Sequence, residues 1–149
     1  MPTNLYGPND NFTENDSHVI PGLMFRMEKA KNNNSNSFNI WGSGKPLREF
    51  LHVDDLSNAI KFIINNDIED NILNVGSGDE VSIKSIAENI KQVIDYRGDL
   101  SFDKSKPDGN PRKLLDSSKI LNYGWKPEIP LVDGLESTYK WFQQYIKIS

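Results

Sequence analysis

Histidine is the side chain best suited to exchange protons near neutral pH, and this chain has two. His18 follows Ser17, the predicted N-cap of a helix, beside a loop rich in Gly, Pro and Asn. A histidine there could act as a general acid or base, or it could be an ordinary surface or capping residue. Its position alone favours the second interpretation. His52 lies in an alternating strand pattern, so we expect it to be structural.

Metal and thiol chemistry are not predicted. Asp54 and Asp55 are adjacent, but neighbouring residues on a helix do not face each other, so a capping role at a helix start is favoured. With two distant histidines, a His-based metal site is not expected. The chain contains no cysteine, which excludes disulfides, thiolate zinc sites and cysteine nucleophiles within its 149 residues.

One glycine-containing segment, residues 41–48, has the composition of an anion site. Gly42 and Gly44 leave the backbone open to close approach, Lys45 and Arg48 supply positive charge, and Trp41 offers a face for stacking. Together they could hold the base and phosphates of a nucleotide. An ordinary hairpin turn with flanking charges explains the same residues equally well.

A second segment, residues 104–113, gives a similar indication. It combines four cations with a single acidic residue, Asp108, in a loop stiffened by proline. Such a loop suits a diphosphate whose attached group offers hydroxyls to Asp108, although a solvated run of charges is the simpler alternative. Because both segments indicate an anionic, hydroxyl-rich ligand, each strengthens the other.

Several self-sufficient catalytic motifs are missing from the sequence. No Gly-x-Gly-x-x-Gly, P-loop, Gly-x-Ser-x-Gly or His-Glu-x-x-His motif occurs, and no Tyr is followed four residues later by Lys. The residues of this chain therefore predict a binding site more clearly than a complete catalytic one.

The elements that must position these residues alternate between strand and helix. Predicted helices begin near Ser17, Asp54, Ser82, Ser117 and Leu131, and predicted strands cover 38–41, 47–53, 72–75 and 100–102. Residues 1–16 are predicted to be loop after a short apolar stretch. This alternation indicates α/β architecture.

Composition narrows the class of protein further. The length favours one domain, the net charge of −4 argues against a nucleic-acid binder, and no apolar run approaches the roughly 20 residues of a membrane span. The first residues show no signal peptide pattern, so we expect a cytoplasmic protein without membrane partners.

Several segments taken together resemble the GDP-L-fucose synthase family of extended short-chain dehydrogenase/reductases. The matching segments are residues 2–8, 10–12, 17–21, 41–44, 48–55, 74–78, 106–109, 111–116 and 134–142. Those at 48–55 and 74–78 are shared by extended reductases in general, whereas those at 17–21 and 106–116 are more particular to this family. The resemblance covers nearly the whole chain.

The resemblance implies a fold and a position within a larger protein. Residues 1–149 would form the C-terminal, substrate-binding portion of an NAD-dependent epimerase/dehydratase-like domain. It would comprise the end of a Rossmann-type sheet plus a smaller α/β domain, with the N-terminal Rossmann cofactor domain absent. The implied cofactor is NADP(H), the implied substrate is a GDP-sugar, and full-length members of the family are homodimers.

The same resemblance assigns site residues. It implies that His18 is the catalytic acid, which would reverse the interpretation from position alone. The expected cofactor contacts are Pro2, Thr3, Asn4, Leu5 and His18, and the expected GDP-sugar contacts are Arg26, Trp41, Arg48, Asp108 and Lys113. No metal is implied.

The implied activity is NADPH-dependent 3,5-epimerisation and 4-reduction of GDP-4-keto-6-deoxy-D-mannose to GDP-L-fucose. The family's Ser, its Tyr-x-x-x-Lys pair, its cysteine base and its glycine-rich loop have no counterpart here, so we expect a C-terminal fragment that is inactive without the other half. Two alternatives remain: a sibling NDP-sugar epimerase or dehydratase, or a non-catalytic nucleotide-sugar-binding module.

Overall fold

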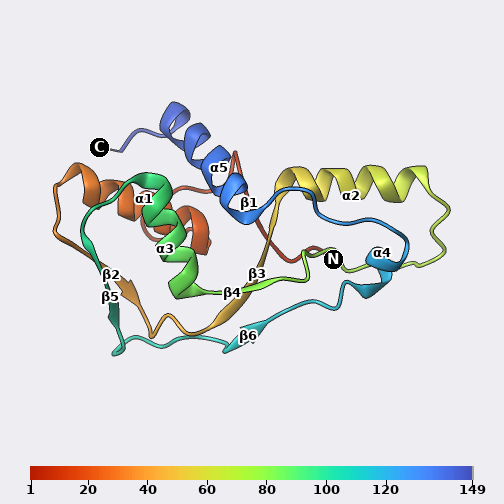
Figure 1. Ribbon diagram of the computed structural model, residues 1–149, viewed down its shortest axis with the longest axis horizontal. Helices are drawn as coiled ribbons and strands as arrows, with labels where there is room; N and C mark the ends of the chain where they lie inside the picture. Colours follow the sequence, from red (N-terminus) through yellow and green to blue (C-terminus); the bar gives the residue numbers. More distant parts are fainter. Residues whose placement is uncertain (149) are drawn as a thin grey trace.

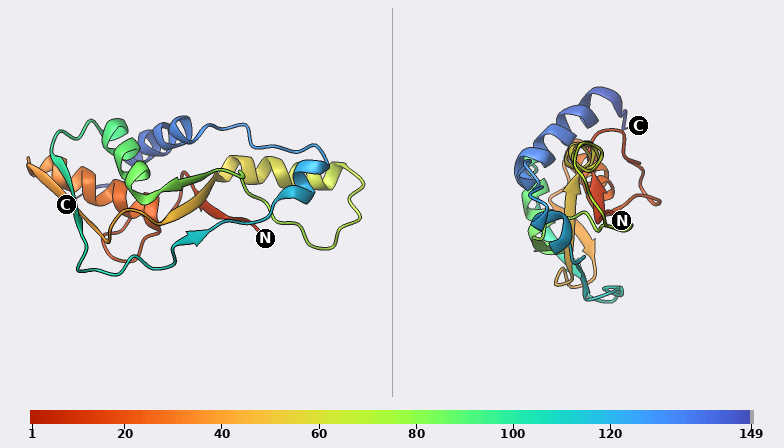
Figure 2. Two further views of the ribbon diagram at one scale, coloured as in Figure 1. Left: turned by 60° about the horizontal axis from the view of Figure 1, so that its bottom comes forward. Right: turned by 90° about the vertical axis from the view of Figure 1, so that its right-hand side faces the viewer.

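The computed structural model describes residues 1–148, which form the mixed α/β structure that the sequence predicts. The molecule is elongated (Figures 1 and 2). Three helices, α1 (Val19–Asn32), α3 (Ile83–Ile94) and α5 (Leu131–Tyr145), gather at one end, and α2 (Val53–Asn65) with the short α4 (Ser118–Asn122) occupies the other. Strand β3 (Leu47–His52) runs between the two ends.

The strands form two small sheets. In the first, β3 pairs in parallel with β1 (Asn4–Tyr6) and β6 (Arg112–Lys113), and antiparallel with β4 (Glu80–Ser82). In the second, β2 (Ser37–Trp41) pairs in parallel with β5 (Asp99–Asp103). The predicted strand at 72–75 is reduced to a single parallel bridge between Val75 and Pro2.

The hairpin turn, one of the two interpretations of residues 41–48, does not form. The strands on either side of it exist, but β2 and β3 belong to different sheets and do not pair with each other. Gly42 and Gly44 both have positive φ, 86° and 75°, and they carry the chain from one sheet to the other. Side chains larger than hydrogen would collide there with Asp108 and Phe102. The segment is therefore a connection between two sheets and not a hairpin turn.

The start of α2 differs from the prediction at one of its two acidic residues. His52 is the N-cap, and its Nδ1 accepts a hydrogen bond from the Asp54 backbone amide at 3.3 Å. Asp54 lies in the first turn as expected. Asp55, however, is buried, and its two oxygens accept hydrogen bonds from the amides of Glu128 and Ile129 at 3.0 and 3.1 Å. It fastens α2 to the segment before α5.

Two apolar clusters hold these elements together. The larger one lies where α1, α3 and α5 pack, and it includes a set of touching aromatic rings: Phe12, Phe25, Tyr139, Trp141 and Phe142. The smaller one lies beneath α2 and is formed by Leu51, Ala59, Val75, Ile120 and Trp125. Within residues 1–148, none of the helices has the length and apolar character needed to cross a membrane.

Candidate functional site

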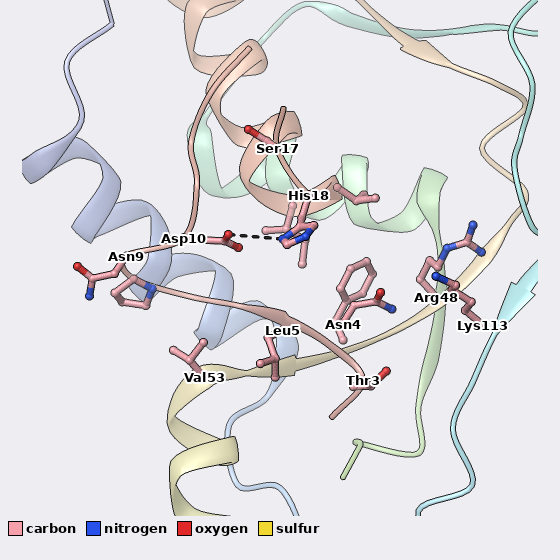
Figure 3. A pocket seen from close by; sticks show the side chains of 14 residues that line it. Thr3, Asn4, Leu5, Asn9, Asp10, Ser17, His18, Arg48, Val53 and Lys113 are labelled. Atoms are coloured by element: carbon pink, nitrogen blue, oxygen red, sulfur yellow. Dashed lines mark ion pairs between the residues drawn. The ribbon is translucent and has the colours of Figure 1, made fainter. Parts of the chain in front are cut away.

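A pocket of about 670 Å³ lies between β1, β3, the start of α1 and the tip of β6 (Figure 3). Its walls are mixed, with polar and charged side chains on several sides and apolar side chains between them. The lining residues are Thr3, Asn4, Leu5, Pro8, Asn9, Asp10, Ser17, His18, Val19, Ile20, Arg48, Phe50, Val53 and Lys113. Six of the ten residues implied by the resemblance therefore meet at one pocket.

His18 lies at the N-cap of α1, in extended conformation with ψ 170°. The predicted cap Ser17 is wrong because its hydroxyl is used elsewhere: it donates to the Thr13 carbonyl at 2.6 Å and accepts from the Thr13 amide at 2.7 Å. The His18 ring makes no capping hydrogen bond and is 84% exposed. Its Nδ1 lies 3.6 Å from Oδ1 of Asp10 (Figure 3). The ring is thus accessible at the pocket wall.

The N-terminal segment forms a second wall. Thr3, Asn4 and Leu5 line the pocket, while Pro2 does not and instead pairs with Val75. The side chains of Thr3 and Asn4 both donate to the backbone carbonyl of Glu49, at 3.3 and 2.8 Å. These bonds fix the two polar side chains against β3.

Two cations form the far side of the pocket from Asp10 (Figure 3). Arg48 on β3 and Lys113 on β6 are register partners of the parallel pair, so their side chains leave neighbouring strands at the same level. Arg48 also donates to the Leu47 carbonyl at 2.7 Å. Paired cations beside a polar pocket are suited to hold a diphosphate.

The other three implied contacts, Arg26, Trp41 and Asp108, lie outside this pocket. Trp41 is 66% exposed, with the Arg26 guanidinium 5.9 Å and the Lys106 ammonium 5.8 Å from its ring centroid. Asp108 accepts hydrogen bonds from the Ser43 amide and hydroxyl at 2.5 and 2.7 Å, and these bonds lower the pKa of its carboxyl group.

The exposed group around Trp41 is connected to the pocket through the loop of residues 104–113. A Cβ placed on Gly109 would lie 3.9 Å from Nη2 of Arg48, so the loop passes close to the pocket cation. One of the loop's four cations is already engaged, since Arg112 pairs with Glu80 at 2.6 Å. The exposed group thus offers the aromatic face of Trp41, and the neighbouring pocket offers the positive charges of Arg48 and Lys113.

Two side chains were missed by the sequence analysis. Asp10 lies in segment 10–12, which resembles the family, but the sequence analysis gave it no role. Its position in the sequence does not show that the loop brings it close to His18. Lys106 was counted only as one of four cations, and its position over Trp41 depends on how residues 104–113 return toward the strand β2.

The first half of the chain, residues 1–76, matches the family model described as the NAD dependent epimerase/dehydratase family. The chain belongs to this family. A probable GDP-L-fucose synthase 1 of Oryza sativa subsp. japonica is 53% identical over 98% of the chain, and the GDP-L-fucose synthase of Escherichia coli K12 is 46% identical over 95%. The chain covers 44% and 47% of those two relatives, so it spans less than half of their length.

Solved structures share the fold of this chain. A GDP-L-fucose synthetase of Naegleria fowleri, crystallised with NADP, superposes with a TM-score of 0.88 at 35% identity, over 96% of this chain and 45% of its own. A UDP-glucose 4-epimerase of Thermotoga maritima superposes with a TM-score of 0.82 at 23% identity, over 98% of this chain and 45% of its own. The second likeness establishes the fold alone.

Proposed function

We propose that this chain provides the nucleotide-sugar side of a GDP-L-fucose synthase, with His18 as the acid of its epimerisation. The observation that carries the proposal is that one pocket brings together His18 and the cation pair Arg48 and Lys113. The identity to GDP-L-fucose synthases of rice and E. coli supports the same assignment.

The proposed substrate is GDP-4-keto-6-deoxy-D-mannose. Its ketone acidifies the protons on the two neighbouring ring carbons, so inversion at C3 and C5 requires only that one group removes a proton and another returns it. His18 supplies the returned proton, because it is a titratable side chain on the pocket wall with an accessible ring. The chain has no cysteine, so the family's cysteine base would come from the portion of the relatives that this chain does not span.

The substrate's diphosphate would lie against Arg48 and Lys113, whose positive charges offset its own. Its base would stack on the exposed face of Trp41, beside Arg26, since an indole ring accepts a base without hydrogen-bond readout. Asp108 would accept from a substrate hydroxyl, which requires the carboxylate to share or release its bonds to Ser43.

The pocket also fits the nicotinamide end of NADP(H), which supplies hydride to C4 of the keto-sugar when bound. Thr3 and Asn4 offer polar groups, Leu5 and Val53 an apolar surface, and the volume of about 670 Å³ falls within the usual range for ligand pockets. The chain carries no glycine-rich phosphate loop. We therefore expect the remainder of the cofactor to be held by the other half of the enzyme, and this chain alone to oxidise no NADPH.

Calorimetric titration of the purified chain with GDP and GDP-fucose tests the proposal. We expect binding, and a roughly 10-fold weakening by Arg48→Ala or Lys113→Ala, because each loses a charged contact worth about 1.5 kcal/mol. Lys140→Ala removes an exposed cation of α5 that does not line the pocket, so it should leave the affinity unchanged. Preference for UDP-sugars would instead favour a sibling epimerase or dehydratase, and binding of no nucleotide would contradict the proposal.

The role of His18 is tested in a protein that joins this chain to the first half of a relative. His18→Gln should reduce epimerisation by about 100-fold or more while NADPH still binds, since general acid catalysis contributes on that order. Unchanged formation of the epimerised product would contradict the assignment. The proposal includes the cytoplasmic location and the homodimer expected from the sequence, and sedimentation of the joined protein tests the latter.

A further inference from the structure

Asp10 is the acidic side chain that lines the pocket, and the proposed reaction assigns it no role. Its side chain is 16% exposed, whereas that of His18 is 84% exposed, and Oδ1 of Asp10 lies 3.6 Å from Nδ1 of His18 (Figure 3). A largely buried carboxylate therefore faces one particular nitrogen of an accessible imidazole.

The loop between these two residues is closed by its own side chains. Oδ1 of Asp10 accepts from the Asn11 amide at 2.7 Å, and the Asn11 side chain donates to the Asp16 carbonyl at 2.8 Å. Thr13 and Ser17 bond to each other through their backbone and hydroxyl groups. These bonds limit how far Asp10 can swing away from His18.

The loop is also anchored from below. Phe12 is buried, with its ring 5.1 Å from that of Phe142 and 5.7 Å from that of Trp141, both on α5. The position of Asp10 is consequently set by a packed aromatic cluster on one side and by hydrogen-bonded turns on the other. The loop therefore holds Asp10 close to the start of α1, where His18 lies.

We propose that Asp10 is a positioning residue that fixes the tautomer of His18. An ionised carboxylate can only accept hydrogen bonds, so it favours the form in which Nδ1 carries the proton. Nε2 is then the nitrogen left for a ligand: it accepts a proton when the ring is neutral and donates one when the ring is charged. The role of this arrangement in catalysis rests on the proposed function, whereas the expected tautomer of His18 is independent of it.

His52 provides a built-in reference of the opposite kind. The exposed Asp54 carboxylate also lies 3.6 Å from Nδ1 of His52, but this nitrogen already accepts a hydrogen bond from the Asp54 amide at 3.3 Å. It therefore carries no proton in the neutral ring, and Nε2 does. The two histidines of this chain are thus expected in opposite tautomers, and one spectrum can report both.

Long-range proton–nitrogen NMR correlation of the ¹⁵N-histidine-labelled chain at about pH 8.5, above the ordinary histidine pKa of about 6.5, tests the proposal. We expect His18 to show the Nδ1-protonated pattern and His52 the Nε2-protonated pattern. Asp10→Ala should return His18 to the mixture of a free histidine while the His52 signals stay in place. Asp16→Ala, which removes an exposed carboxylate from the same loop, should leave both patterns unchanged.

A second variant controls for the possibility that Asp10→Ala disrupts the loop of residues 10–17. Asp10→Ser keeps an acceptor for the Asn11 amide but is too short to reach the His18 ring, so it should lose the tautomer preference with the loop intact. An unchanged His18 pattern in both variants, or an Nε2-protonated His18 in the parent chain, would overturn the proposal. Either result could occur together with normal GDP binding, so failure here is distinguishable from failure of the proposed function.

Discussion

The two histidines show that environment, and not residue type, decides what a side chain does. His18 stands on the pocket wall with an accessible ring, whereas His52 is buried, caps α2 and has its Nε2 3.4 Å from the Ser137 hydroxyl. The Ser137–His52 contact is not a nucleophile–base pair. Because Nδ1 of His52 accepts from a backbone amide, Nε2 carries the proton and cannot remove one from serine.

The buried ring of His52 should make stability depend on pH. Burial lowers the pKa of His52 below its ordinary value of 6.5, although the nearby Asp54 and Asp55 oppose the shift. The unfolded chain therefore binds more protons than the folded one just below pH 6.5, so this contribution to stability is fully present above that pH and is lost as the pH falls. Hydrogen-bonded carboxyl groups with lowered pKa, such as Asp108, titrate below this window.

Urea unfolding at pH 7.5 and 5.5 measures the effect. The free energy of unfolding should be lower at pH 5.5, and His52→Asn should reduce that difference, because asparagine can cap the helix but does not titrate. His18→Asn removes the exposed ring and keeps His52, so it should preserve the difference. An equal pH dependence in the His52→Asn chain would show that the buried ring is not its source.

Glu49 is a buried carboxylate on β3 whose oxygens bind the backbone of two loops. Oε1 accepts from the Gly78 amide at 2.8 Å and Oε2 from the Leu115 amide at 3.2 Å, and Gly76 is packed directly against the carboxylate. A methyl group on Gly76 would collide with it. We therefore expect Gly76→Ala to destabilise the chain by about 1–3 kcal/mol, measured by urea unfolding. Gly78→Ala provides a comparison: the site has open space, so any loss of stability there comes only from the φ of 80°, which is strained for alanine.

At the scale of elements, local patterns predicted most helices and strands but not how they associate. Ser82 caps α3 as expected, because its hydroxyl accepts from an amide three residues away, and an N-cap is a local feature. The error at residues 42–44 arose because the glycines indicate a turn without indicating what the flanking strands pair with. Strand β2 pairs with β5, whereas β3 pairs with β1, β4 and β6, and all of these partners are distant in sequence.

Asp55 illustrates the same limit for a single side chain. Its position in the first turn of α2 predicts a cap, yet its oxygens bind the amides of Glu128 and Ile129. Asp55→Ala would leave two partly buried amides without these acceptors, which should cost about 2–4 kcal/mol of unfolding free energy. The neighbouring Asp54→Ala is the matched control and should cost less than about 1 kcal/mol, because Asp54 is exposed. Equal costs would show that Asp55 acts only at the helix terminus.

At the scale of the whole molecule, the candidate site is assembled from segments that are distant in sequence. The pocket draws on residues near 3–5, 8–10, 17–20, 48–53 and 113, and the Trp41 group adds residues from α1 and the 104–113 loop. The sequence indicates the two segments that we propose bind an anion, because their composition is local. The approach of Asp10 to His18, and of Lys106 to Trp41, follows from tertiary packing and has no such local signal.

The end of the molecule formed by α2 leaves apolar surface uncovered. Ile60 and Ile64, one turn apart on α2, are 50% and 76% exposed, although the helix is strongly amphipathic in sequence. Strand β1 also lies at the edge of its sheet in the part of the chain that the structure describes. Exposed aliphatic side chains and an open strand edge each favour association with another polypeptide.

This surface predicts that the isolated chain self-associates. Replacing both Ile60 and Ile64 with lysine should shift it toward monomer, because the added charges repel and remove the apolar contact, with little effect on stability since both side chains are already exposed. Sedimentation velocity over a range of protein concentrations measures the change. Val132→Lys, an exposed apolar position on the first turn of α5, is the matched control and should not alter association. If the double variant associates as strongly as the parent chain, or the control disrupts association equally, the α2 face is not the contact surface.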